Sequence, residues 1–254
     1  MRPTERFSSR AEDYARYRPG YPPAAIALLV ARCGLRPGAV VADVGSGTGL
    51  LTAALLAQGA QVYAVEPNDS MRAAAEAQLR DQSRFHSVNA SAEHSSLASA
   101  SVDLWVAGQA FHWFDVAAAR REALRIIRRD GAAALLWNER PAQPGAFLEE
   151  YDALLRRFAP EYEQIVASRA NEASMRAFLG GTMQQATFAN EQVFDFEGLR
   201  GRLMSSSYAP QAGQPTHQAL LQGLQQLFER HQRAGRITFP YQTLVYFAQL
   251  QPAA

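Results

Sequence analysis

Hydrophobic and polar positions follow two periods along the first half of the chain. Short apolar runs, typical of buried strands, alternate with longer stretches whose apolar positions are three or four residues apart, which is typical of helices. This order indicates βαβ units on a parallel sheet. The apolar runs predict strands at Val40–Val44, Gln61–Val65, Phe85–Asn89, Val102–Ala107 and Ala132–Trp137.

Capping residues place helices between these strands. Asn68 precedes a helix that carries Arg72–Arg80, and Asp115 starts a helix that carries Arg120–Arg128, because short polar side chains accept hydrogen bonds from free N–H groups of a first turn. The segment Arg128–Gly131 is expected to end the second helix and turn into the fifth strand. Right-handed crossovers place the loops that follow the strands at one edge of the sheet.

The periodicity changes after Arg140. The breaker cluster Pro141–Gly145 precedes helical patterns in Phe147–Phe158 and Ser174–Leu179. We expect these helices to form a cap above the carboxyl edge of the sheet, where it excludes water from a ligand. The alternative is a helical pair that only covers the sheet edge.

Two later runs complete the predicted sheet. Strands are expected at Gln192–Phe196 and Thr243–Phe247, around a helix at Gln218–Arg233. The expected fold class is α/β, with a Rossmann-like, seven-stranded, mostly parallel sheet, helices on both faces and a helical cap inserted after the fifth strand.

Three alternating glycines follow the first predicted strand. Gly45, Gly47 and Gly49 permit positive φ and let a ligand approach the main chain where a Cβ would collide. Their G-x-G-x-G spacing differs from the dinucleotide fingerprint, since Leu50 stands where its third glycine would fall, which argues against NAD. The chain also lacks the G-K-[ST] sequence that holds a triphosphate. A nucleoside without phosphates is therefore favoured.

An acidic residue, Glu66, ends the next apolar run, about 20 residues after the glycines. A carboxylate there accepts hydrogen bonds from both ribose hydroxyls. Together, V-A-D-V-G-S-G-T-G and V-Y-A-V-E-P-N resemble the first two motifs of class I S-adenosylmethionine-dependent methyltransferases. The resemblance implies S-adenosyl-L-methionine as cofactor and methyl transfer to a small organic acceptor.

An aromatic-rich stretch, Val102–Asp115, ends the fourth predicted strand. With Asp13–Pro22 and Ser205–Pro210, it resembles a small-molecule group that includes the trans-aconitate and ubiquinone/menaquinone-type methyltransferases, the first more closely. In that group, the loop after the fourth strand borders both the amino-acid part of the cofactor and the acceptor. The resemblance covers most of the chain and is diffuse beyond Arg140, where the acceptor is selected.

This resemblance implies that Gln109 and Ala110 lie near the methionine part of the cofactor, and His112 or Trp113 near the methyl group. Methyl transfer from a sulfonium depends mainly on alignment, because the departing thioether is neutral. His112 is the candidate for an optional base, with packing between its aromatic neighbours as the alternative. Trp113 and Tyr14 either face the sulfonium through cation–π attraction or belong to the core.

The segment Asn89–Glu93 fits the part of the family that borders adenine, with Ser91 in place of the usual acid and the main-chain N–H of Ala92 facing the base. Arg18 either pairs with the cofactor's carboxylate or forms a surface salt bridge of little value. The predicted catalytic residues are His112, Trp113 and Tyr14, and the predicted cofactor contacts are Arg18, Asp43, Gly45, Ser46, Gly47, Glu66, Pro67, Met71, Ser91, Ala92, Gln109 and Ala110.

We expect one methyltransferase domain over residues 1–254. Its parts are an N-terminal lid segment (1–38), the cofactor-binding core (39–140), the helical cap (141–185) and the remaining strands and helix (186–254). Two alternatives stay open: an enzyme that attacks another carbon of the sulfonium, by cyclisation or elimination, and releases methylthioadenosine, and a non-catalytic nucleoside-binding or partner-binding protein.

Composition limits the partners. With 25 Lys and Arg against 24 Asp and Glu, there is no general electrostatic reason to expect nucleic acid or an anionic membrane, and a small-molecule substrate is favoured. The basic residues near 230–236 are interpreted as a solvated helix face. Histidines without ligand spacing argue against a metal site. The single cysteine, Cys33, fits a buried thiol in a reducing compartment.

The first residues, Met1–Arg18, lack the apolar segment of a signal peptide, and no apolar run approaches the roughly 20 residues of a membrane helix. We therefore expect a soluble, cytoplasmic protein. Its oligomeric state, monomer or dimer, stays open.

Overall fold

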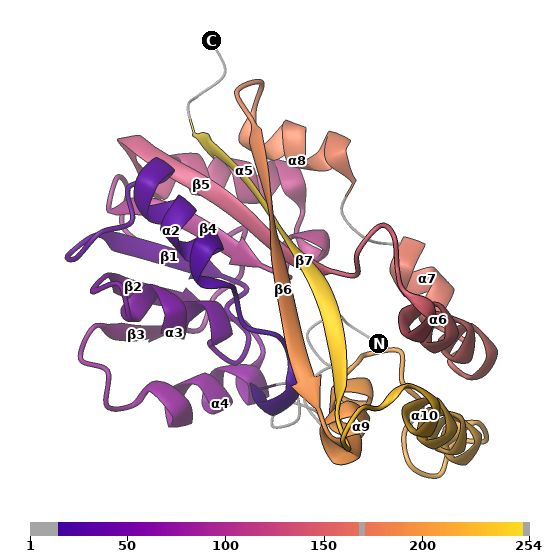
Figure 1. Ribbon diagram of the computed structural model, residues 1–254. Coiled ribbons are helices and arrows are strands. Elements are labelled where there is room, and N and C mark those ends of the chain that lie inside the picture. Colours follow the sequence, from indigo (N-terminus) through magenta and orange to yellow (C-terminus); the bar gives the residue numbers. More distant parts are fainter. Residues whose placement is uncertain (1–14, 168–170, 251–254) are drawn as a thin grey trace.

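The computed structural model describes residues 15–167 and 171–250, which build a seven-stranded sheet in the order β3-β2-β1-β4-β5-β7-β6 (Figure 1). Strands β1 to β5 pair in parallel, whereas β7 runs antiparallel to both β5 and β6. The predicted α/β class and mostly parallel, Rossmann-like sheet are confirmed. The strands are β1 Val40–Val44, β2 Gln61–Val65, β3 Phe85–Val88, β4 Val102–Gly108, β5 Ile127–Glu139, β6 Gln184–Phe194 and β7 Ile237–Gln249.

Two predicted helix starts are confirmed. The Asn68 side chain accepts a hydrogen bond from the N–H of Met71 at 3.0 Å, and the Asp115 side chain accepts one from Ala118 at 2.9 Å. Each such cap stabilises a helix by ~1 kcal/mol. The helices are α2 Pro23–Arg32, α3 Leu50–Leu56, α4 Asp69–Leu79, α5 Val116–Ile126, α6 Ala146–Phe158, α7 Tyr162–Ala167, α8 Glu172–Leu179, α9 Phe196–Met204 and α10 His217–His231.

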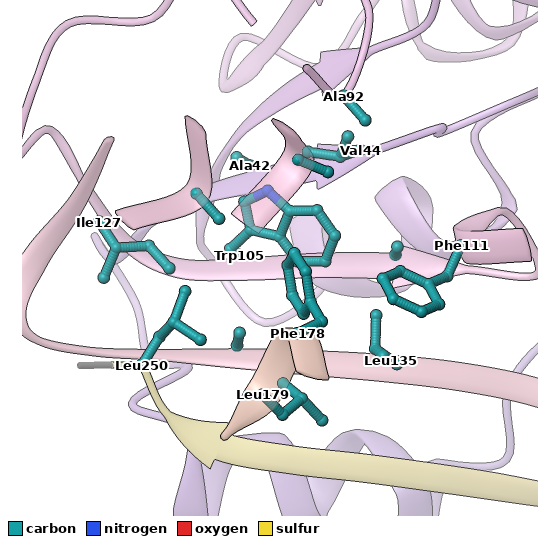
Figure 2. Close-up of a cluster of buried hydrophobic side chains, with 14 of the residues drawn as sticks. Ala42, Val44, Ala92, Trp105, Phe111, Ile127, Leu135, Phe178, Leu179 and Leu250 are labelled. Atoms are coloured by element: carbon teal, nitrogen blue, oxygen red, sulfur yellow. The ribbon is translucent and has the colours of Figure 1, made fainter. Parts of the chain in front are cut away.

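The central strand β4 buries side chains on both faces of the sheet. Trp105 belongs to the core on the face that α5 and α8 cover, and Leu104 and Val106 belong to the core on the face that α2 and α3 cover. Trp105 is fully buried beside Phe178 of α8, with the ring centroids 4.8 Å apart (Figure 2). Burying a large apolar side chain contributes about 1.5–3 kcal/mol. These contacts therefore anchor the strand whose end carries several candidate residues.

Helix α5 ends earlier than predicted. It stops at Ile126, and Ile127 already pairs with Val102 of β4, so the turn expected at Arg128–Gly131 lies inside β5. The register between β4 and β5 shifts directly after this pair, as in a β-bulge. The exposed charged side chains of residues 128–130 are tolerated in this irregular strand start, where the sequence indicated a turn.

The chain around residues 184–204 also differs from the prediction. Strand β6 spans Gln184–Phe194 instead of Gln192–Phe196, and α9, which the sequence did not predict, begins at Phe196. Its N-cap is Asp195, whose side chain accepts a hydrogen bond from the N–H of Gly198 at 2.8 Å. Most of β6 is exposed or half-buried, because β6 is an edge strand, so it carries only a weak apolar signal.

The helical cap is built from different segments than the predicted unit 141–185. Helix α6 packs against α10, which lies between β6 and β7 in the sequence, and with α9 these helices enclose a third core. Tyr151 of α6, Leu203 of α9 and Leu224 of α10 are fully buried there. Helix α8 packs on α5 instead, because its Phe178 belongs to the core beneath the sheet. Figure 1 shows α6, α7 and α10 gathered on one side of the molecule.

The Cys33 side chain lies at the end of α2 and is buried, as expected. Burial raises the pKa of its thiol to about 12, so Cys33 stays protonated and packs as a small apolar group. Across residues 15–167 and 171–250, every helix is too short or too polar to cross a membrane.

Candidate active site

A cavity of about 170 Å³ lies at the carboxyl edge of the sheet. Its walls come from the glycine loop after β1, the loop after β4, the end of β5, the first half of β7, and α9 with the residues that follow it. Open α/β sheets bind ligands at this edge, because the loops that follow neighbouring strands meet there. This is also the edge at which the sequence predicts its ligand loops.

Two glycines of the loop after β1 have different surroundings. Gly45 and Gly47 both have positive φ, 69° and 57°. A methyl group on Gly45 would collide with the Cβ of Ala110, so Gly45 is required for close packing of the loops after β1 and β4. Around Gly47, no described atom lies within 4 Å of the position that a Cβ would take. Because Gly47 also lines the cavity, a ligand can approach the main chain there.

Glu66 holds the glycine loop from the end of β2. Its Oε2 accepts a hydrogen bond from the N–H of Gly47, and its Oε1 accepts one from the N–H of Asn68, both at 2.9 Å. Burial raises the pKa of Glu66, while these two donors act to lower it. The carboxylate does not line the cavity, and ribose binding by Glu66 stays a prediction. Each carboxylate oxygen keeps a second lone pair for such a bond.

Asp43, at the end of β1, is fully buried and lines the cavity. Its Oδ2 accepts a hydrogen bond from the Thr52 hydroxyl at 2.6 Å, whereas its Oδ1 has no partner among the described residues. Burial raises the pKa of Asp43 to about 7, against the lowering effect of the Thr52 hydrogen bond. A buried acceptor without a donor costs about 1–3 kcal/mol. A cationic donor on a ligand would remove this cost.

The loop after β4 reaches toward the glycine loop. Gln109 has a positive φ of 58°, which is uncommon for a residue other than glycine and tends to occur at functional sites. Its side-chain amide donates a hydrogen bond to the carbonyl of Asn138 at 3.0 Å, which ties the loop to the end of β5. Gln109 lines the cavity, whereas Ala110 is buried beside Gly45. Of this predicted pair, Gln109 is the residue that a ligand can touch.

The aromatic residues after β4 divide between the core and the cavity. Phe111 is buried and packs edge-to-face on Phe178, with the ring centroids 5.1 Å apart. His112 and Trp113, which belong to the 3₁₀ helix Phe111–Trp113, line the cavity with their ring centroids 4.7 Å apart. His112 and Trp113 are thus available to a ligand, and their catalytic roles stay predictions.

The other predicted residues also divide into those that line the cavity and those that lie elsewhere. Arg18 lines the cavity and donates a hydrogen bond to the carbonyl of Ser205 at 3.2 Å. Tyr14 lies outside the described residues. The predicted residues that line the cavity are Arg18, Asp43, Gly45, Ser46, Gly47, Gln109, His112 and Trp113. Those described elsewhere, at the ends of β2, β3 and β4 or at the start of α4, are Glu66, Pro67, Met71, Ser91, Ala92 and Ala110.

Beside β5 and β7, the cavity is lined by arginines and tyrosines that the sequence analysis missed. Arg202 donates from Nε to the Tyr241 hydroxyl at 2.7 Å, and Arg140 donates from Nη1 to the Asp152 carboxylate at 2.8 Å. Burial acts to raise the pKa of Tyr208, but the nearby guanidinium groups lower it overall. This end of the cavity is therefore basic and rich in hydroxyl groups.

The described residues contain no cluster of three His, Cys, Asp or Glu side chains suited to a metal ion.

Comparison with known sequences finds a segment that is similar to methyltransferases. Residues 42–135 match the family model described as a methyltransferase domain. An uncharacterized methyltransferase of Mycobacterium tuberculosis is 37% identical over 139 residues, which cover 55% of this chain and 54% of that protein. The match thus spans about half the length of this relative. An uncharacterized methyltransferase of Schizosaccharomyces pombe is 26% identical over 254 residues, covering 97% of each chain.

Solved structures extend the likeness in fold. A protein of Anaeromyxobacter dehalogenans, named as a type II methyltransferase, has a TM-score of 0.63 at 22% identity, with 93% of this chain and 100% of that chain covered. Haemonchus contortus phosphoethanolamine N-methyltransferase 2, in complex with phosphomonomethylethanolamine and S-adenosylhomocysteine, has a TM-score of 0.51 at 14% identity, with 97% and 58% covered. Residues 42–135 are therefore similar to a methyltransferase domain, and the chain shares its Rossmann-like fold with solved methyltransferase structures.

Proposed function

We propose that this protein transfers the methyl group of S-adenosylmethionine to a small organic acceptor. The observation that carries the proposal is one cavity that joins the open space at Gly47 to the unpartnered Oδ1 of Asp43. The full-length relative from S. pombe is named a methyltransferase, and a fold neighbour is a methyltransferase in complex with S-adenosylhomocysteine.

The residues at the glycine loop fit this cofactor. S-adenosylmethionine supplies an electrophilic methyl group when bound. The Asp43 Oδ1 is suited to accept a hydrogen bond from the ammonium of the methionine part, because charge-assisted pairs are the strongest hydrogen bonds in a buried site. Glu66 is suited to the ribose hydroxyls, and Ser91 and Ala92 to the adenine edge. Arg18, which lines the cavity, is suited to the methionine carboxylate.

The cavity extends beyond the glycine loop toward β5 and β7, which favours a route that uses an acceptor over cyclisation or elimination without one. His112 and Trp113 line the same cavity from the loop after β4. We assign Trp113 to contact with the sulfonium through its ring face. His112 either removes a proton from the acceptor or positions it.

The composition of the chain supports a type of partner and a cellular location. The near balance of 25 basic and 24 acidic residues supports a small-molecule acceptor over nucleic acid or an anionic membrane. The single, buried Cys33 supports a reducing compartment, and we assign the protein to the cytoplasm.

Calorimetry and product analysis test this proposal. The protein should bind S-adenosylmethionine and S-adenosylhomocysteine but not NAD, because the glycine spacing fits a nucleoside without phosphates. Mass spectrometry after incubation with acceptors should detect S-adenosylhomocysteine. Methylthioadenosine as the product would identify the acceptorless route, and tight cofactor binding without turnover would identify a binding protein. Tighter binding of NAD than of S-adenosylhomocysteine would refute the cofactor assignment.

A further inference from the structure

Residues 17–21 form one wall of the cavity. Those that line it are Arg18, Pro19 and Tyr21. Tyr17 packs directly on α9, because a Cβ on Gly201 would collide with its ring. Tyr21 packs in the same way on the last residue of β4, because a Cβ on Gly108 would collide with its hydroxyl group. Two glycines therefore make room for this wall, and Arg18 lies between the two contacts.

Asn138, near the end of β5, holds the middle of this segment. Its Nδ2 donates hydrogen bonds to the carbonyl of Gly20 at 3.1 Å and to the carbonyl of Pro19 at 3.3 Å. Its Oδ1 accepts one from the Thr243 hydroxyl at 2.5 Å and one from the Asn190 amide at 3.0 Å. The donors and the acceptor of this side chain are all used, so its orientation is fixed.

Thr243 and Asn190 set this orientation. Thr243, in β7, is fully buried and pairs with Asn138 across the sheet. Its hydroxyl accepts a hydrogen bond from the Asn190 amide at 3.3 Å and donates its own proton to Asn138. The Asn190 amide also donates to the Gly20 carbonyl at 2.9 Å. Side chains of β5, β6 and β7 therefore meet at one point of the N-terminal segment.

The main chain of Asn138 connects this wall to the loop after β4. Its carbonyl accepts the hydrogen bond from the Gln109 side chain at 3.0 Å. Gln109 has a positive φ, a conformation that persists where neighbouring groups hold it. Arg18 and Gln109 both line the cavity, and both are predicted cofactor contacts. Asn138 thus places these two side chains relative to each other.

We propose that Asn138 is a positioning residue of the cofactor site, whose side chain fixes the wall that carries Arg18. This inference rests on the proposed methyltransferase function and on the assignment of Arg18 to the methionine carboxylate. Asn138 acts through Arg18, because its own polar atoms already have partners in the protein. An aspartate would place a carboxylate oxygen against two main-chain carbonyl oxygens, which have no proton to donate.

Asn138→Asp tests this role with little change in size. S-adenosylhomocysteine, which keeps the methionine carboxylate, should bind at least tenfold more weakly in calorimetry, because the charged partner of this carboxylate is displaced. Asn171→Asp is the matched control, since it makes the same change at the N-cap of α8, where an aspartate also caps. The control should bind S-adenosylhomocysteine as the wild type does. Wild-type affinity in Asn138→Asp would overturn the proposal.

Asn138→Ala removes the two donors without adding a charge. It should weaken the binding of S-adenosylhomocysteine about fivefold or more, because the carbonyls of Pro19 and Gly20 lose neutral hydrogen bonds. This variant decides the question if Asn138→Asp does not fold. Wild-type affinity in Asn138→Ala would also overturn the proposal.

A double-mutant cycle with Arg18→Met separates positioning from a general structural effect. Arg18→Met alone should weaken the binding of S-adenosylhomocysteine at least tenfold. In a chain that carries Arg18→Met, Asn138→Asp should weaken binding by less than about threefold more, because no charged side chain is left to position. The same factor in both backgrounds, or an unchanged affinity in Arg18→Met, would contradict the role of Asn138.

The same titrations separate this inference from the proposed function. If S-adenosylhomocysteine does not bind to the wild type, the methyltransferase proposal fails, and this inference fails with it. If it binds to the wild type and to Asn138→Asp with equal affinity, only the positioning role fails.

Discussion

Replacing Asp43 with asparagine tests whether this carboxylate is held in the cavity without a positive partner. Asp43 is fully buried, and burial raises its pKa to about 7, from roughly 3.9 in an unfolded chain. In the folded protein without ligand, the neutral acid is therefore favoured below about pH 7. One pKa unit corresponds to ~1.4 kcal/mol, so the shift of roughly three units corresponds to ~4 kcal/mol.

The sign of the effect follows from the direction of the shift. Because the pKa of Asp43 is higher in the folded state, its contribution to stability is fully present below about pH 4, falls as the pH rises, and is lost above about pH 7. Asp43→Asn removes this titration. The difference in free energy of unfolding between the variant and the wild type should therefore shift by ~3 kcal/mol in favour of the variant when the pH is raised from 5 to 8.

Urea unfolding at the two pH values, without ligand, measures this change. The control is Asp115→Asn, the same chemical change at an exposed helix N-cap. S-adenosylhomocysteine should bind to Asp43→Asn at least tenfold more weakly, because the ammonium loses a charged acceptor. If wild type and variant differ by the same amount at pH 5 and pH 8, the carboxylate is ionised throughout and the reasoning is wrong.

Five further substitutions test other parts of the structure. Gly47→Ala should change the free energy of unfolding by only about 1 kcal/mol but weaken the binding of S-adenosylhomocysteine at least tenfold. Gly45→Ala should be clearly more destabilising, because its methyl group would collide with Ala110. Equal losses of stability in urea would contradict the different surroundings of the two glycines. Glu66→Ala should weaken the binding of S-adenosylhomocysteine by about ten- to hundredfold. It should also lower the free energy of unfolding by about 1–3 kcal/mol, since two buried N–H groups lose their acceptor. An unchanged calorimetric affinity in a folded variant excludes the ribose role. His112→Ala should lower turnover by about a hundredfold while cofactor affinity stays within a few fold, and wild-type turnover would make His112 structural. Trp105→Ala should cost about 3–5 kcal/mol in urea unfolding, and a loss below 1 kcal/mol would contradict its role in the core.

The parts of the site that short-range chemistry determines were predictable from the sequence. The strand and glycine loop over residues 40–49 form as expected, because an apolar run and a positive-φ turn follow one another directly. Asn68 and Asp115 cap their helices because a cap needs only a side chain and an N–H three residues later. Where structure depends on neighbours in sequence, local patterns were sufficient.

The end of the cavity beside β7 depends on contacts between distant residues. Arg202 meets Tyr241, which is 39 residues away, and Arg18 meets the carbonyl of Ser205, which is 187 residues away. No local pattern distinguishes Arg202 from an exposed arginine such as Arg200 until α9 is placed against β7. Similarly, the pairing of α6 with α10 is a choice between several amphipathic helices, which periodicity alone does not make.

The order of strands has a consequence for synthesis of the protein on the ribosome. Strand β7 lies between β5 and β6, although it is made after β6. Until residues 237–249 emerge, β6 lacks β7, the strand that it pairs with in the described sheet, and the apolar side of α6 stays uncovered until α10 is complete. Strands β1 to β5 pair without these later segments. The nascent chain can therefore build strands β1 to β5 first, and chaperone protection matters most while β6, α9, α10 and β7 are still being translated.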